Sequence, residues 1–158
     1  MQPADFLRII SVTDAGAAVV SNSTPPAITV SVNKLVEICR GLHANAETYF
    51  DQLSCVTGID NGVEAKTMEV IYHLYSIPYN FSVALKVVLP REQPVVPTLS
   101  SVWKSANWLE RETFDMYGII FEGHPDLRRI LMPADWEGYP LRKDYSEQEK
   151  YREIQVKY

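Results

Sequence analysis

Hydrophobic and polar residues follow two different periods along this chain, and the periods predict where strands and helices lie. Between residues 67 and 76 apolar and polar positions alternate, which puts Met68, Val70, Tyr72 and Leu74 on one face of a strand. Enrichment in β-branched and aromatic residues predicts two more strands, at about residues 48–57 and 81–89, with turns at 60–62 and 78–80 between the three. Residues 70–85 therefore indicate a hairpin and not a membrane helix, which needs about 20 consecutive apolar residues.

Two segments have the period of an amphipathic helix. In residues 33–43 the apolar positions Leu35, Cys39 and Leu42 share one face, which places the Cys39 thiol in the core. A second helix is predicted from Thr98, which can cap it, to Gly118, which can end it in the left-handed region. Opposite its apolar stripe lies a stripe of charged and aromatic residues: Trp108, Arg111, Glu112 and Asp115.

The remaining segments are short. Residues 3–14 predict a first helix, and residues 17–21 and 27–32 predict a hairpin around a proline turn at 21–26. Three prolines indicate that residues 90–97 form a linker across the sheet edge. We expect one domain over residues 1–145 and a short polar C-terminal tail over residues 146–158.

Composition narrows the class of protein. The 158 residues carry a formal net charge of −5, which argues against binding to nucleic acid, because such binding depends on clustered Lys and Arg. The two cysteines, Cys39 and Cys55, are too few to ligate a zinc ion or an iron–sulfur cluster alone. We expect no signal peptide and a reducing compartment.

Residues 108–145 interleave charges with aromatic side chains, a mixture that is typical of a surface covered by another protein. His124 precedes Pro125, so we expect it in a turn, bonded to local backbone, with a proton-handling role as the alternative. Arg128 and Arg129 point to opposite sides if extended, so one can pair with Glu112 or Asp115 while the other faces a partner carboxylate. A solvated surface pair is the alternative for both arginines, and loop packing is the alternative for Trp136.

A small metal-dependent enzyme is the competing hypothesis. Glu112 and Asp115 are spaced i, i+3 and can converge on one ion, with His124 nearby in sequence. Glu110 and Glu112 lie about 200° apart around a helix and cannot converge. The sequence contains no HExxH, no GxSxG and no phosphate-binding glycine loop, so this hypothesis rests on residue types alone.

The same region carries a family resemblance. The run ERETFDMYGIIFEGHPDLRRILMP at residues 110–133, followed by DWEGYPLRKDY at 135–145, resembles the signature of the C subunit of proton-pumping NADH:quinone oxidoreductase, respiratory complex I. The resemblance is dense over residues 103–145, whereas the first 45 residues match in length and element order only. The same signature occurs in ferredoxin-dependent relatives and in membrane-bound hydrogenases, which are the alternative assignment.

The resemblance implies an α+β fold of two layers, in which helices pack on a mixed sheet in the order helix, two strands, helix, three strands. It implies a structural subunit without cofactors, while FMN and iron–sulfur clusters belong to other subunits that carry electrons from NADH to quinone. It implies a peripheral position on the cytoplasmic side of the inner membrane, with membrane contact only through the complex. The expected partners are the large quinone-site subunit, which is the D subunit of the complex, and neighbouring iron–sulfur subunits. The residues expected at these contacts are Trp108, Arg111, Glu112, Asp115, His124, Arg128, Arg129, Trp136, Arg142, Lys143 and Asp144.

Overall fold

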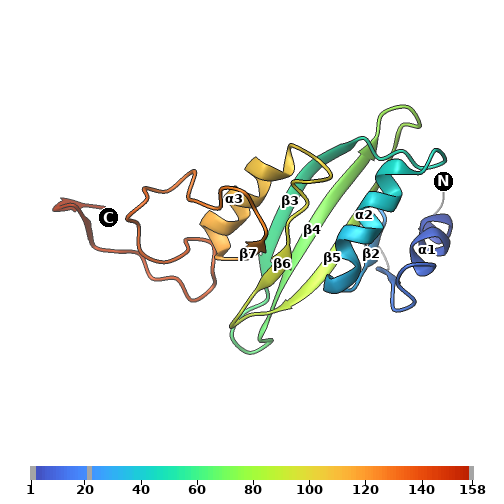
Figure 1. Ribbon diagram of the computed structural model, residues 1–158. Helices are drawn as coiled ribbons and strands as arrows, with labels where there is room; N and C mark the ends of the chain where they lie inside the picture. The colour runs from blue at the N-terminus through green and yellow to red at the C-terminus, as the bar shows by residue number, and fades with distance from the viewer. Residues whose placement is uncertain (1–2, 21–22, 157–158) are drawn as a thin grey trace.

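A five-stranded mixed sheet organises the chain in the computed structural model, which describes residues 3–20 and 23–156 (Figure 1). The strand order is β1-β2-β5-β4-β3, and β2 runs parallel to β5 while the other neighbours are antiparallel. The α+β class and the mixed sheet implied by the resemblance are therefore confirmed. The elements up to the end of the sheet are α1 (Pro3–Ser11), β1 (Ala18–Val20), β2 (Ala27–Thr29), a 3-10 turn (Val32–Lys34), α2 (Leu35–Ala44), β3 (Gln52–Asp60), β4 (Thr67–Ser76) and β5 (Phe81–Pro90).

The hydrophobic core lies where α1 and α2 cover one face of this sheet. The period-two pattern of β4 is confirmed, because Met68, Val70, Tyr72 and Leu74 are all fully buried. The helices contribute their apolar stripes from the other side, and Cys39 is fully buried among them, as expected. Burial raises the pKa of the Cys39 thiol, so this sulfur is an inert core atom.

The predicted hairpins are present, with shifted ends. β1 and β2 pair as the first hairpin, although Ser21 at the edge of the expected proline turn lies outside the described residues, as does Tyr158 in the tail. The prediction that the third strand begins at Thr48 was wrong, since β3 begins at Gln52. Thr48 lies instead in the turn that follows α2, where its Oγ1 donates to Leu42 O at 2.9 Å.

Two predictions for the following segment were wrong. The linker contains β6 (Val95–Pro97), which pairs in parallel with β7 (Ile120–Glu122) as a second small sheet. The helix α3 (Ala106–Tyr117) begins at Ala106 and not at Thr98. Residues 98–105 form turns instead, because Trp103 donates to Phe50 O at 3.0 Å and Ser105 donates to Leu53 O at 3.0 Å, which ties the segment to the start of β3. Within residues 3–20 and 23–156 no helix has the length and apolar character needed to cross a membrane.

Candidate partner interface: the C-terminal arm

Beyond α3 the chain leaves the sheet and extends away from it as a looped segment (Figure 1). We call residues 122–156 the C-terminal arm; every residue of this described range keeps some of its surface exposed. Its regular structure beyond the end of β7 is a two-stranded ribbon of β8 (Lys150–Tyr151) and β9 (Ile154–Gln155). A segment of this length without a core of its own must be held by contacts of another kind.

Asp115 on α3 supplies the first of these contacts. Its carboxylate is completely buried, and Oδ2 accepts the backbone N–H groups of Ile130, Leu131 and Met132 at 2.9, 2.7 and 2.8 Å. Oδ1 pairs with the Arg129 guanidinium at 2.7 Å. Burial alone raises the pKa of Asp115, but the donors of Met132, Arg129, Ile130 and Leu131 outweigh burial and hold the pKa below its ordinary value. The carboxylate is therefore a charged anchor for three successive peptide groups of the arm.

Two arginines complete this anchor. Arg129 also donates to Trp136 O at 3.0 Å and Gly138 O at 2.8 Å, so one guanidinium joins α3 to two turns of the arm. Arg111, which is 7% exposed, donates from α3 to the carbonyls of Arg128 and Arg129 at 3.1 and 3.3 Å. The guanidinium fork suits such multiple acceptors. The prediction that one of the adjacent arginines pairs internally with Glu112 or Asp115 is confirmed, since Arg129 pairs with Asp115.

A second anchor joins the arm to the far end of the sheet. Asp60, at the end of β3, accepts both Nε and Nη2 of Arg91 at 2.8 and 2.9 Å and the N–H of Lys143 at 2.9 Å. Arg91 in turn reaches Asp144 of the arm at 2.5 Å. The Arg91 guanidinium, followed by the Lys143 and Gly62 N–H groups, lowers the pKa of Asp60 well below its ordinary range, although burial opposes the shift. The end of β3 and the residue that follows β5 thus hold residues 143–144 through charge-assisted bonds.

The end of α3 leaves room for the arm through one glycine. Gly118 ends the helix with φ +71°, and its N–H donates to Phe114 O at 2.8 Å, as the sequence predicted. A Cβ at this position would lie 2.5 Å from the Tyr139 ring, so a larger residue would displace the arm. Arg142 donates to Tyr117 O at 2.7 Å, and its guanidinium lies 5.1 Å from the centre of the Tyr139 ring.

His124 bonds local backbone, as predicted for its place before Pro125. Its Nδ1 accepts the N–H of Asp126 at 3.0 Å, and its Nε2 lies 3.0 Å from Asn107 O. This pair of contacts suits a neutral ring with its proton on Nε2. Glu110 lies 4.0 Å from Nε2, and both side chains are completely covered by this chain. Burial raises the pKa of Glu110 to about 7, against the donors Thr98 Oγ1 and Leu99 N–H.

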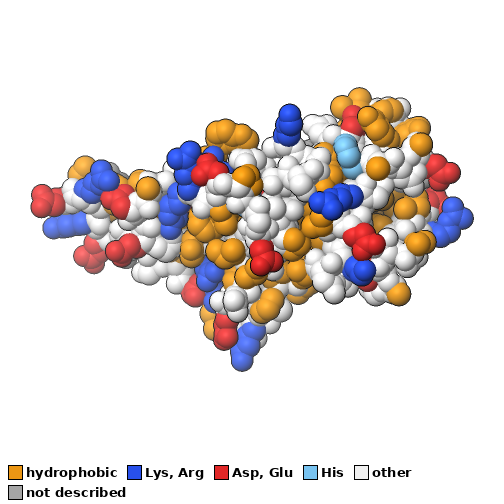
Figure 2. All heavy atoms as spheres, in the orientation of Figure 1, with side chains coloured by type: hydrophobic (Ala, Val, Ile, Leu, Met, Phe, Trp, Pro, Cys, Tyr) orange, Lys and Arg blue, Asp and Glu red, His pale blue; other side chains and the backbone are white. Residues whose placement is uncertain are grey.

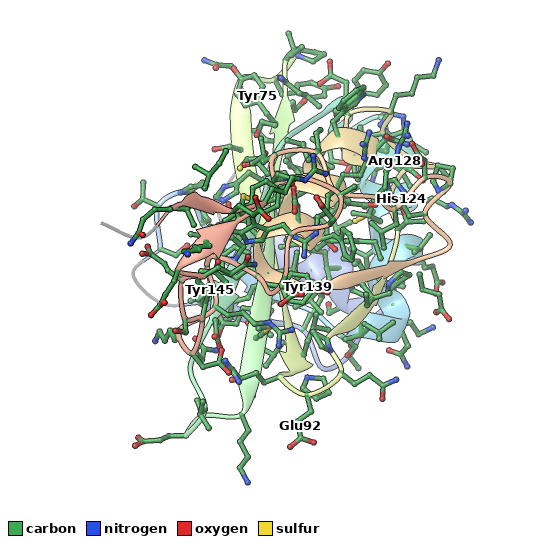
Figure 3. All side chains as sticks on the ribbon, turned by 90° about the vertical axis from the view of Figure 1, so that its left-hand side faces the viewer. Tyr75, Glu92, His124, Arg128, Tyr139 and Tyr145 are labelled. Atoms are coloured by element: carbon green, nitrogen blue, oxygen red, sulfur yellow. The ribbon has the colours of Figure 1, made fainter. Side chains whose placement is uncertain are left out.

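The other residues expected at a partner contact lie on the outside. Trp108 is 62% exposed, and Glu112 is exposed on the same helix. Arg128 pairs with Asp126 at 3.0 Å, but its side chain is 73% exposed, and Figure 3 shows it on the same side of the arm as His124. Trp136 packs against Tyr151 at 5.2 Å and donates to Tyr145. Their contact with a partner stays a prediction, whereas Asp115, Arg111 and Arg129 face their own arm.

The geometry does not bring together the residues of the metal-enzyme hypothesis. Glu112 is exposed, whereas Asp115 is buried with both oxygens occupied by Arg129 and backbone donors. Both ring nitrogens of His124 are engaged with backbone. Among the residues that the structure describes, no three His, Cys, Asp or Glu side chains gather as ligands would have to. The donor set therefore favours an anchoring role for these residues.

Sequence reasoning missed two of the anchoring residues. Asp60 lies in the predicted turn at residues 60–62 and Arg91 in the predicted linker at 90–97, and neither was predicted to bind the arm. Neither position has a local pattern that pairs it with residues 143–144, because the contact spans 83 residues between Asp60 and Lys143. The one available signal in the sequence was that Asp60 is a charged residue in a turn just after a predicted strand.

Comparison with known proteins supplies the family. Residues 28–151 match the family described as "Respiratory-chain NADH dehydrogenase, 30 Kd subunit". The C subunit of NADH-quinone oxidoreductase from Chloroherpeton thalassium is 40% identical over 147 residues, which are 92% of this chain and 60% of that protein. The C subunit from Chlorobium phaeobacteroides is 42% identical over 92% of this chain and 88% of its own length, and the C 2 subunit from Rhizobium meliloti is 49% identical over 75% and 65%. The chain thus spans about two thirds or less of two of these three relatives.

Solved structures agree with the fold. A trypsin-resistant fragment of Nqo5 superposes with a TM-score of 0.59 at 27% identity, over 80% of this chain and 100% of the fragment. A chain of the archaeal membrane-bound sulfane sulfur reductase superposes with a TM-score of 0.75 over 90% of this chain and 85% of its own length, and at 22% identity it shows the shared fold alone. The family match covers most of the chain, including β3, β4, β5, α3 and most of the arm. The chain belongs to the family of the 30 Kd subunit of respiratory-chain NADH dehydrogenase.

Proposed function

We propose that this chain is a structural subunit of a membrane-bound NADH:quinone oxidoreductase and binds no cofactor itself. Its arm docks on the large quinone-site subunit, next to the subunits that hold iron–sulfur clusters. In this proposal FMN and the clusters of the other subunits carry the electrons from NADH to quinone, and this chain braces the quinone-reducing module at the membrane surface. Family membership supports the complex, and the arm supports the role within it.

The observation that carries the proposal is an arm that is ordered yet open to solvent. Charged anchors fix its path, while every residue from 122 to 156 keeps some of its surface exposed. Large apolar side chains remain outside, with Leu131 at 60%, Leu141 at 53% and Trp108 at 62% exposure. A partner that covers them would gain apolar burial without the entropic cost of ordering the arm.

The arm also contains a concave site suited to a side chain of a partner. A pocket of about 190 Å³ opens between its turns and is lined by Met132, Trp136, Pro140, Tyr145, Glu147, Gln148 and Val156. Aromatic walls around such a hollow are typical of places where a partner inserts one anchoring side chain. The pocket lies within the arm itself, so its shape depends on the anchors described above.

Affinity purification of the full chain tests the proposal directly. We expect the large quinone-site subunit and iron–sulfur subunits to co-purify in stoichiometric amounts. The variant Arg128→Ala removes an exposed ion pair, so it should leave the chain folded, yet weaken assembly by about 2–5 kcal/mol if the guanidinium is buried against a partner carboxylate.

Lys34→Ala is the matched control, because Lys34 forms a similar exposed ion pair with Glu37 at 3.0 Å at the start of α2. It should assemble like the unmodified chain. Purification of the unmodified chain without large partners, from cells that contain the complex, would contradict the proposal.

A further inference from the structure

A second group of apolar side chains is exposed at the tip of the β4–β5 hairpin. We call Tyr49, Ile77, Pro78 and Tyr79 the hairpin patch; Tyr49, Ile77 and Tyr79 are 45%, 61% and 49% exposed. Figure 2 shows hydrophobic side chains gathered at the upper right of the molecule, at the end of the sheet away from the arm. Figure 3 shows Tyr75, near this tip, at the end of the sheet opposite Glu92, which lies just beyond the end of β5.

The hairpin patch is held rigidly. The Tyr79 hydroxyl donates to Ala46 O at 2.5 Å, and the N–H of Ile77 donates to Asp51 Oδ1 at 2.9 Å, so the tip is fastened to the loop between α2 and β3. Asn80 takes φ +51° in the turn, and its side chain accepts the Tyr75 hydroxyl at 2.6 Å. These bonds fasten the backbone and tyrosine hydroxyls of the tip and leave the Ile77 side chain in solvent.

Buried aromatic rings support the exposed ones. Tyr79 stacks on Phe81 with 5.7 Å between ring centres, and Phe81 meets the buried Phe50 edge to face at 5.3 Å. Rigid aromatic side chains backed by a packed core lose little conformational entropy when a partner covers them. This makes the hairpin patch different from single exposed apolar residues, which are common on any surface.

The charged side chains of the two segments that build the hairpin patch are acidic. The two segments that build it contain no Lys or Arg between Arg40 and Lys66 or between Lys66 and Lys86. Glu47 is exposed two residues before Tyr49, and Asp51 is half-buried and accepts the N–H of Ile77. An apolar centre with an acidic rim attracts a partner that carries basic side chains around an apolar one, and it repels an anionic lipid surface.

We propose that the hairpin patch is a second docking surface, occupied by a segment of a neighbouring subunit that presents an apolar side chain flanked by Lys or Arg. The inference rests on the proposed function as a complex subunit and adds a contact at the end of the sheet opposite the arm. The chain then bridges two contacts through its rigid sheet. Ile77 fills an apolar site of the partner, while Glu47 and Asp51 face its cations.

A charge introduced at the centre of the patch tests the inference in the assembled complex. Ile77→Lys puts a cation at the centre of the surface, and we expect about tenfold less of this variant to be retained after a moderate salt wash of the purified complex. Val63→Lys is the matched control, because Val63 is 59% exposed in the β3–β4 loop at the other end of the sheet. Equal retention, or equal loss, of the two variants would overturn the inference. Unchanged urea midpoints of both isolated variants show that the fold is intact.

Carbodiimide cross-linking of the same complex identifies the occupant. It joins a carboxylate to a lysine amine in contact with it, so we expect peptides that link Glu47 or Asp51 to a lysine of another subunit. Reaction of both carboxylates with added glycine ethyl ester to the same extent in the complex and in the free chain would overturn the proposal.

Two further outcomes name other occupants and also overturn it. One is dimerisation of the full chain that Ile77→Lys abolishes, and the other is flotation with phosphatidylglycerol vesicles. Failure of the proposed function would look different, since the unmodified chain would then not assemble at all.

Discussion

The sheet with its helices and the C-terminal arm are stabilised by different forces. Residues 3–121 bury a continuous apolar core that includes Phe6, Leu42, Tyr72 and Leu85. Residues 122–156 add no fully buried apolar residue to it and are held by Asp115, Arg111, Asp60 and the groups that these contact. The sheet is therefore stabilised by transfer of apolar surface from water, and the arm by a few charge-assisted hydrogen bonds.

This difference shows where the shape of the arm is encoded. The acceptors and donors that fix its path belong to α3, to the end of β3 and to the residue after β5, all of which lie in the region that carries the apolar core. A few buried charges then place about 35 residues whose side chains remain largely available to a partner. The arrangement predicts that the arm can be released without unfolding the sheet, whereas the arm cannot keep its path once the sheet unfolds.

Removal of the central anchor should have the largest effect. Asp115→Ala leaves three N–H groups without their acceptor and the Arg129 guanidinium without a carboxylate to neutralise it, and breaking such a buried pair costs about 3–5 kcal/mol. We expect amide hydrogen exchange at residues 130–132 to accelerate strongly while the amides of β4 stay protected. Equal acceleration in both regions would show that arm and sheet open together and would break the comparison.

A cavity in the core should destabilise the sheet without loosening the arm. Leu85→Ala removes a fully buried side chain from β5, and substitutions of this kind cost about 2–5 kcal/mol. Urea unfolding should show a lower midpoint for the sheet, while exchange at residues 130–132, which occurs by local opening, keeps its rate. A variant with faster exchange in the arm and an unchanged urea midpoint would contradict this expectation.

The sheet was largely predictable from the sequence, for a physical reason. Alternation over residues 67–76 depends on local geometry, and β4 has those bounds in the structure. The start of α3 was not predictable by periodicity, because apolar positions continue through Leu99, Val102 and Trp103 without a helix. There the Trp103 ring donates a hydrogen bond to Phe50 O, and this tertiary contact overrides the helical preference of the segment.

The arm was predictable only in part. Local chemistry gave the turn at His124, the end of α3 at Gly118 and the internal pairing of one arginine with Asp115. It did not give the burial of Arg111, which the helical period placed on an outer stripe. The arm folds back over that stripe, and a long-range contact of this kind has no signature in a single helix.

The free energy of unfolding should depend on pH through Glu110, which is buried on α3 between the sheet and the arm. Burial raises its folded pKa to about 7, so the unfolded chain releases this proton first, and the free energy of unfolding falls by about 2–3 kcal/mol from pH 5 to pH 8. Below pH 4.5, the ordinary pKa of the group, the contribution is fully present, and it is lost as the pH rises through the folded pKa. In Glu110→Gln this decline should be absent, so the variant should be more stable than the unmodified chain at pH 8. Urea titrations at several pH values measure it, and parallel curves would show that Glu110 does not titrate in this range.

The smallest effect is expected at an exposed ion pair within the arm. Asp126→Ala removes the partner of Arg128, and both side chains are largely in solvent, at 47% and 73% exposure. Such pairs contribute less than about 1 kcal/mol, so exchange at residues 130–132 should change little. Comparison with Asp115→Ala separates the effect of an exposed ion pair from that of a buried carboxylate that binds the backbone of the arm. If the exposed pair were as important as the buried one, the arm would be held by its total charge and not by the few carboxylates that bind its backbone.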